Sequence, residues 1–326
     1  MSPFRCLTVL LVGLALMQAS ASAEPLSHSP DQPPASPKGI QGMWVWRQQW
    51  YSDAQERAAL LAFCQRWGIN RLLVQVHMDR QAQPMTFRDP EALARLIADA
   101  ADLGIAVEAL DGAPEMAAES NRPAAMATLE AILAFNASLP PGRRFVGVHY
   151  DIEPYVSPTW KAGQPQRQQM MRDLLTFYHA VRDKLDREAP GMTLAADIPM
   201  WYDHKTQPDD SCMIEFNGQL KNLHQHIQDV CDYVGIMSYR RHALGNNSVV
   251  YHISAELDYA EQIGKTICPA LETIELKSEP QITFFGTSAS EFWTQHNLVR
   301  QTLNDRPGFG GMLTHSYRGL RDLLEP

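Results

Sequence analysis

Three ionisable side chains stand at every second position in the segment RFVGVHYDIEPYV, residues 144–156. They are His149, Asp151 and Glu153, and the residues between them are apolar or aromatic. Alternate residues of a β-strand lie on one face, so the segment predicts a strand with an apolar face and an ionisable face. Carboxylates and imidazoles can exchange protons with a bound molecule, which makes the ionisable face a candidate site of acid–base chemistry.

Seven further segments have the length and composition of buried strands. They are MWVW from 43, RLLVQVH from 71, IAVEAL from 105, TLAADIP from 193, DYVGIMSY from 232, KTICPALE from 265 and FGGMLTHS from 309. Together with FVGVHYDIE from 145 they make eight predicted strands.

Helical patterns occupy the intervals between these strands. The expected helical ranges are 52–68, 89–104, 122–136, 166–185, 216–230, 254–264 and 288–304. Ser52 and Asp89 are the expected N-caps of the first two, and Gly68 and Gly104 their stops. A βα unit repeated eight times predicts an α/β protein with a (β/α)8 TIM barrel. An open doubly wound sheet is the alternative, but no glycine-rich loop follows the first strand.

Alternation along the strands assigns a set of polar side chains to the inside of the barrel. The set comprises Gln75, His77, His149, Asp151, Glu153, Asp197, Tyr239, Glu272 and His315, with Glu108 as a further inward candidate. Most of them stand near the C-terminal ends of their strands, where TIM barrels place their chemistry. Clustered carboxylates shift one another's pKa values, so one of them can stay protonated and act as an acid.

Aromatic residues follow the same strand ends: Tyr155 and Trp160 after the fourth strand, then Trp201 and Tyr202 after the fifth. An aromatic ring offers a flat surface for the apolar face of a sugar, although ordinary loop packing explains such residues equally well. Trp201 and Tyr155 are therefore candidate substrate-binding residues, together with Gln75, His77, His149 and His315.

The opening segment resembles the fourth-strand motif D-G-x-D-x-D-x-E of family 18 glycoside hydrolases, the chitinase-like TIM barrels. Gly147, Asp151 and Glu153 match this motif. Val146 and His149 stand at its first two Asp positions.

Two other strands resemble the same family in part. Met237 and Tyr239 match the sixth-strand pattern M-x-Y-D, in which the Asp is replaced by Arg240. The glycines at 310–311 match the eighth-strand pattern G-G-x-x-x-W, in which the Trp is replaced by His315.

The resemblance implies a glycoside hydrolase with Glu153 as general acid and Asp151 as its partner. In the family this Asp orients the N-acetyl group of the substrate, which attacks the anomeric carbon with help from the sixth-strand Tyr, here Tyr239. No nucleophile from the enzyme is then required. Asp197 is a further residue expected to orient the substrate or to stabilise charge.

A second scheme resembles the retaining barrel glycosidases that carry the acid on strand four and a nucleophile on strand seven. Glu153 and Glu272 occupy those places. Two other classes also remain open. One is a metal-dependent hydrolase using His77, His149, Asp151 and Asp197; the other is a catalytically inactive barrel that binds sugars. We expect no cofactor and no metal, because no zinc-type spacing is present.

The N-terminal residues have the pattern of an export signal. Arg5 precedes the apolar run 7–17, and ASA at 21–23 suits cleavage, so residues 1–23 are a predicted signal peptide. Residues 24–40, rich in Pro and Ser, are a predicted linker, and 41–326 the catalytic barrel. We therefore expect an exported protein, periplasmic or secreted, without stable membrane insertion.

The overall charge bears on the choice of partner. The formal net charge is −9 and no basic stripe is present, which argues against nucleic acid. A carbohydrate is the expected partner, and the oligomeric state is not predicted. Cys212 and Cys231, the closest pair of cysteines in the mature chain, are either a disulfide or two buried thiols.

Overall fold

The computed structural model describes residues 39–203 and 212–326. The predicted signal peptide and the predicted linker up to residue 38 lie outside the described residues. The first strand begins at Ile40, so the last residue of the predicted linker belongs to the barrel. Among the described helices, none has both the length and the apolar character that a membrane span requires.

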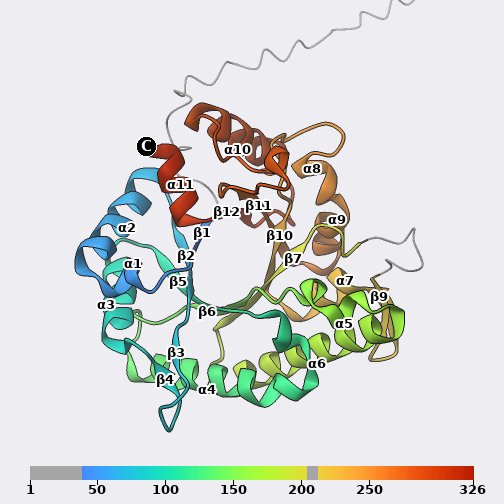
Figure 1. The fold of residues 1–326 in the computed structure, drawn as a ribbon, viewed down its shortest axis with the longest axis horizontal. Helices are drawn as coiled ribbons and strands as arrows, with labels where there is room; N and C mark the ends of the chain where they lie inside the picture. The colour runs from blue at the N-terminus through green and yellow to red at the C-terminus, as the bar shows by residue number, and fades with distance from the viewer. Residues whose placement is uncertain (1–38, 204–211) are drawn as a thin grey trace, which may run out of the picture.

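Eight parallel strands close into a barrel, as the alternating pattern predicted (Figure 1). The strands are β1 (Ile40–Val45), β2 (Arg71–Gln75), β5 (Ala106–Asp111), β6 (Gly147–Tyr150), β7 (Thr193–Pro199), β10 (Tyr233–Met237), β11 (Thr266–Glu272) and β12 (Gly311–His315). Each strand pairs with the next along the chain, and β12 closes the barrel against β1. The (β/α)8 TIM-barrel prediction is confirmed, and β6 is its fourth strand.

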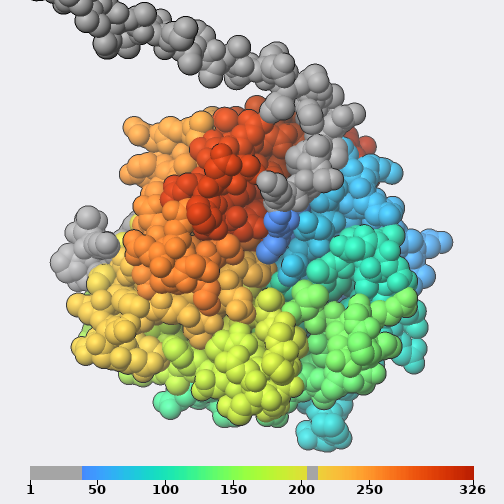
Figure 2. All heavy atoms as spheres, turned by 180° about the vertical axis from the view of Figure 1, so that it is seen from behind, coloured from blue at the N-terminus to red at the C-terminus, as the bar shows by residue number. Residues whose placement is uncertain are grey.

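Helices surround this barrel. They are α1 (Gln49–Ser52), α2 (Ala54–Trp67), α3 (Pro90–Asp102), α4 (Arg122–Ser138), α5 (Pro158–Lys161), α6 (Gln164–Glu188), α7 (Leu223–Val230), α8 (Val249–His252), α9 (Ser254–Ile263), α10 (Ala289–Leu303) and α11 (Tyr317–Leu324). Short 3-10 turns are η1 (Pro114–Ala117), η2 (Glu119–Asn121), η3 (Pro154–Val156) and η4 (Pro280–Ile282). Seen from behind, the segments run around the molecule in sequence order (Figure 2).

Local capping explains where the first long helices begin and end. Asp53, not Ser52, caps α2, because its carboxylate accepts hydrogen bonds from the N–H groups of Gln55 and Glu56. Gly68 ends that helix with a φ of 66°, in the left-handed region that favours glycine. Asp89 caps α3, as expected.

The expected helix over 216–230 is only half correct. Residues 216–222 belong to a hairpin of β8 (Met213–Phe216) and β9 (Gln219–Asn222). The helix α7 begins only at Leu223. Asn217 and Gly218 have φ angles of 49° and 74°, the conformation of a two-residue hairpin turn. A second hairpin joins β3 (Met78–Asp79) to β4 (Thr86–Phe87).

The fourth strand is shorter than predicted, because β6 ends at Tyr150 and not at Glu153. The N–H of Asp151 still donates to the carbonyl of Asp111, at 3.0 Å, so Asp151 stays attached to β5. Pro154 starts η3 and has no N–H to extend the ladder. Asp151 and Glu153 therefore stand in the loop that leaves the strand.

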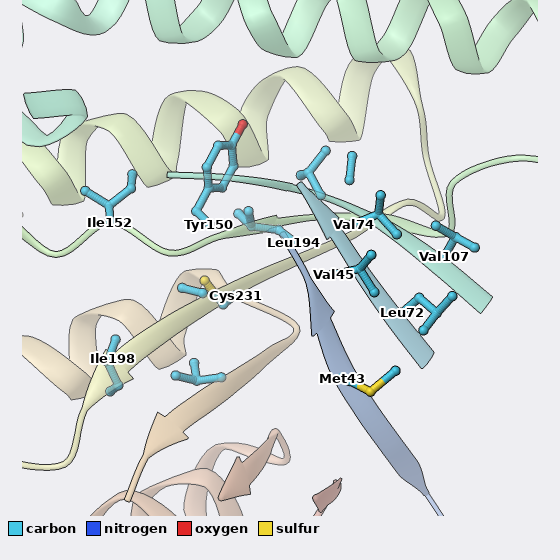
Figure 3. Packing of buried hydrophobic residues seen from close by; sticks show 14 of the residues in the cluster. Met43, Val45, Leu72, Val74, Val107, Tyr150, Ile152, Leu194, Ile198 and Cys231 are labelled. Atoms are coloured by element: carbon cyan, nitrogen blue, oxygen red, sulfur yellow. The ribbon is translucent and has the colours of Figure 1, made fainter. Parts of the chain in front are cut away.

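Period-two alternation divides the barrel side chains into two apolar clusters. The outer cluster packs strands against helices; Figure 3 shows Val45, Val74 and Val107 of neighbouring strands within it. The inner cluster contains Trp44, Leu73, Leu110, Ala195, Tyr233, Cys268, Ala270 and Leu313. The predicted faces are confirmed, since Val148, Tyr150 and Ile152 belong to the outer cluster.

The four cysteines of the described residues are buried and none is in a disulfide: Cys64, Cys212, Cys231 and Cys268. The disulfide considered between Cys212 and Cys231 is therefore not formed, and these residues serve as small apolar side chains.

The inner cluster predicts where the barrel is sensitive to truncation. Leu313→Ala removes a fully buried side chain from the barrel centre and should lower the free energy of unfolding by about 2–5 kcal/mol. Leu220→Ala, at a residue 68% exposed on β9, is the control and should change it by less than about 0.5 kcal/mol. Urea unfolding of both variants measures the difference; equal effects would contradict the packing described.

Candidate active site

Asp151 is fixed at the mouth of the barrel by its backbone. Gly112, just after β5, lies directly against it: a Cβ at residue 112 would stand 2.1 Å from the carbonyl oxygen of Asp151. Only glycine allows this approach. The chain leaving β6 is thereby held close to the chain leaving β5.

The side chain of Asp151 favours its protonated form. Burial raises the pKa of this carboxyl well above its usual range, and the negative charges of Asp197 and Glu153 raise it further, whereas His149 opposes them. Its Oδ1 atom is buried and has no hydrogen-bond partner among the described residues. A neutral carboxyl in this position can donate a hydrogen bond to a bound molecule.

Glu153 stands two residues further on and is half-buried. The hydroxyl of Tyr155 donates a hydrogen bond to its Oε1 atom. The ring of Tyr155 packs edge-on against Trp201, with centroids 5.1 Å apart. Both rings are half-buried, while Trp160 and Tyr202 are buried behind them. An aromatic wall therefore begins beside the Glu153 carboxyl.

Tyr239, two residues beyond β10, faces the same group of acids. Burial raises the pKa of its hydroxyl well above the usual range. The charges of Glu272, Asp151, Asp197 and Glu153 add to this shift, the first of them most strongly. Tyr239 thus keeps its proton and can donate a hydrogen bond among these carboxyls.

Glu272, the last residue of β11, is buried and already engaged. Its Oε1 atom accepts hydrogen bonds from the N–H groups of Thr273 and Ile274, each at 2.7 Å. Nδ1 of His315 lies 3.0 and 2.9 Å from its two oxygens. The other ring nitrogen of His315 accepts from the indole N–H of Trp46, at 2.8 Å. His315 is thereby held between Glu272 and Trp46.

His149 lies below Asp151 and is fully buried. Its Nδ1 lies 3.1 Å from Oε2 of Glu108, and its Nε2 lies 2.8 Å from Oδ2 of Asp197. Burial alone would lower the pKa of His149, but the charges and contacts of Asp197 and Glu108 raise it to about 10. The residue expected to contact substrate instead connects two strands inside the barrel.

Among the described residues, neither of the two polar residues predicted on the second strand is hydrogen-bonded to a carboxyl of the site, and His77 stands beyond the end of β2. Nε2 of His77 contacts the carbonyl of Trp46 at 3.1 Å, and its ring lies 6.4 Å from that of Tyr51. Gln75 ends β2 and is half-buried. The contacts of His77 connect it to Trp46 and not to an acid.

Several residues of the site were missed from the sequence. Trp44 donates its indole N–H to Oδ2 of Asp197 at 3.0 Å, Trp46 contacts His315, and Arg71 pairs with Glu108. Tyr233, whose hydroxyl lies 3.1 Å from Nδ1 of His149, was missed as well. Period-two alternation could have revealed these residues, because each falls among the inward-facing positions of its own strand.

The metal-dependent alternative lacks a suitable set of ligands. Within residues 39–203 and 212–326, no group of three or more His, Cys, Asp or Glu is arranged to hold a metal ion. Each ring nitrogen of His149 lies close to a carboxylate oxygen, Nδ1 at 3.1 Å and Nε2 at 2.8 Å.

Comparison with known proteins finds similarity in structure alone. No protein-family model matches the sequence, and no curated protein matches it in sequence. Among solved structures, a chitinase from Chromobacterium violaceum superposes with a TM-score of 0.50 at 14% identity, covering 88% of this chain and 99% of that one.

Two further structures are similar. The spore cortex-lytic enzyme SleL of Bacillus cereus gives a TM-score of 0.51 at 12% identity, over 89% of this chain and 74% of that one. A chitinase from Bacteroides thetaiotaomicron gives 0.51 at 11% identity, over 87% and 91%. The resemblance seen in the sequence motifs is thus confirmed at the level of the fold.

The contacts of His149 predict a pH dependence of stability. Because its pKa is about 10 in the folded protein and 6.5 ordinarily, its contribution is complete below pH 6.5 and is lost as the pH rises through about 10. The free energy of unfolding should therefore fall between pH 7 and pH 9.5 in the unaltered protein. In His149→Gln the free energy of unfolding should fall less between these two pH values, as measured by urea titration at each.

His242→Gln is the matched control for this measurement, because His242 is exposed in the loop after β10. The free energy of unfolding of His242→Gln should depend on pH in the same way as that of the unaltered protein. The same dependence in His149→Gln would contradict an imidazolium at residue 149.

Proposed function

We propose that the chain is an exported glycoside hydrolase, with Glu153 as the proton donor. The observation that supports this most is the arrangement at the C-terminal mouth of the barrel: Glu153 follows Asp151, whose environment favours the neutral carboxyl, and Tyr239 faces both. Acid-catalysed glycoside cleavage requires a carboxyl that gives its proton to the glycosidic oxygen, and hydrogen-bond donors beside it that hold the substrate.

In the proposed reaction, Glu153 gives its proton to the glycosidic oxygen as the bond to the anomeric carbon breaks. The N-acetyl oxygen of the same sugar attacks that carbon, and neutral Asp151 and Tyr239 hold the N-acetyl group by hydrogen bonds. Water then attacks the anomeric carbon and opens the ring formed in this way. The Glu153 carboxylate takes up the proton that this water loses. This substrate-assisted route needs no nucleophile from the protein.

The substrate proposed is a polymer or oligomer containing N-acetylated amino sugars. Two of the structures compared are named chitinases and the third a spore cortex-lytic enzyme, and the motif residues Asp151 and Glu153 are present here. The half-buried rings of Tyr155 and Trp201 would support a sugar ring beside Glu153. The predicted signal peptide, residues 1–23, supports export of the enzyme to the periplasm or out of the cell.

Replacement of the acid tests this function. Glu153→Gln removes the transferable proton but preserves the shape, so hydrolysis of chitooligosaccharides should fall about 100- to 10,000-fold. Binding of the same oligosaccharides, measured by calorimetry, should persist. Glu130→Gln, at an exposed residue of α4, is the control and should keep full activity.

Two outcomes of this experiment would contradict the proposal. Full activity in Glu153→Gln on a substrate that the unaltered protein cleaves would remove Glu153 from the mechanism. Binding without hydrolysis in the unaltered protein, across acetylated glycans, would favour the inactive sugar-binding barrel.

A trapping experiment distinguishes the two carboxylate schemes. In the alternative, Glu272 attacks the anomeric carbon, but its oxygens already contact two backbone N–H groups and His315. Incubation with an activated 2-fluoro glycoside, which lacks the N-acetyl group, should therefore leave the protein without a covalent sugar. Intact-mass spectrometry checks this, and an adduct on a peptide containing Glu272 would support the nucleophile scheme instead.

A further inference from the structure

Two carboxylates lie beside the two ring nitrogens of the buried His149. Nδ1 of His149 lies 3.1 Å from a carboxylate oxygen of Glu108, and Nε2 lies 2.8 Å from one of Asp197. A neutral imidazole carries a proton on one nitrogen and a lone pair on the other. A lone pair only 2.8 or 3.1 Å from a carboxylate oxygen would be repelled, so these two distances fit a ring protonated on both nitrogens.

The surroundings of His149 balance that charge. The groups facing it directly or through its partners are Glu108 on β5, Asp197 on β7, Tyr233 on β10, Arg71 on β2, Cys268 on β11 and Asp151 on its own segment. Arg71 and His149 are positive, and Glu108 and Asp197 are negative, so these four sum to zero. Buried charges are tolerated when they are paired in this way.

Neutral donors complete the arrangement at both ends. The hydroxyl of Tyr233 donates to Oε2 of Glu108 at 2.7 Å and lies 3.1 Å from Nδ1 of His149. The indole N–H of Trp44 donates to Oδ2 of Asp197. Gly235 gives Asp197 its space, since a Cβ there would stand 2.1 Å from Oδ1.

Asp197 connects this buried arrangement to the mouth of the barrel. Tyr150 of β6 pairs with Ala196 of β7, so Asp151 and Asp197 are the next residues on two neighbouring segments. The charge of Asp197 is one of the influences that keep Asp151 protonated, second to burial, and the charge of His149 acts on Asp151 in the opposite direction. The position of Asp197 and the balance between its charge and that of His149 therefore determine whether Asp151 presents a neutral or an ionised carboxyl to a substrate.

We propose that His149 is a positioning residue: as an imidazolium bridging Glu108 and Asp197, it fixes the Asp197 carboxylate on the strand next to Asp151 and so sets the protonation state in which Asp151 meets the substrate. His149 is fully buried and acts through Asp197. The part concerning substrate rests on the proposed function, whereas the charged state of the ring does not.

The charged state is measured first, on the unaltered protein. Nitrogen NMR of histidine-labelled protein at pH 8 should show one ring with both nitrogens protonated, while exposed histidines are neutral. The signal is assigned by its loss in His149→Gln. A neutral ring at residue 149 would overturn the proposal, whatever the catalytic activity and whether or not the variant folds.

The action on Asp151 is measured with two opposite variants. His149→Gln removes a positive charge and should move the basic limb of the pH–rate profile to higher pH; Asp197→Asn removes a negative charge and should move it to lower pH. Each shift should be on the order of one pH unit. The control His242→Gln should leave the profile unchanged.

The outcomes separate this inference from the proposed function. Shifts in the same direction, or activity losses without any shift in folded variants, would indicate a structural role and overturn the positioning role. If Glu153→Gln retains full activity, the proposed function fails, but the NMR result still decides whether residue 149 is an imidazolium.

Discussion

The interior of this protein depends on charge pairing inside a closed barrel. Eight parallel strands leave no free edge, and the alternate residues of each must fill a space that water does not reach. Here that space holds an apolar cluster and, beside it, Arg71, Glu108, His149 and Asp197. Leaving any one of these charges without its partner inside the barrel would cost far more than a surface ion pair contributes.

The strand register explains how these charges meet. His149 pairs across the sheet with Leu110 on β5 and with Ala195 on β7. Glu108 therefore lies two residues before the β5 partner, and Asp197 two residues after the β7 partner. Because barrel strands tilt, side chains offset in this way come to one level, and His149 reaches both acids.

The sequence allowed prediction of the strands and their faces, because burial on one side imposes a period of two. It did not allow prediction of the contacts between strands, which depend on register and tilt. His149 was expected at the substrate and instead joins two acids, since nothing in RFVGVHYDIEPYV reveals Glu108 across the sheet. The hairpin at Asn217 and Gly218 was hidden within an apparently helical stretch, although its Asn-Gly pair was a usable signal.

The contacts of each carboxyl bear on which of them could attack a sugar. A nucleophile needs an oxygen lone pair directed at the anomeric carbon, and Glu272 directs its oxygens at two backbone N–H groups and at His315. Freeing it would remove the partner of the Ile274 N–H, whereas the Thr273 N–H also donates to the carbonyl of His315. Among the described residues, Glu153 has only the Tyr155 hydroxyl to release, and one oxygen of Asp151 has no hydrogen-bond partner. Of these three acids, the two that leave β6 therefore have fewer contacts to give up among the described residues, and Glu272 holds His315 in place.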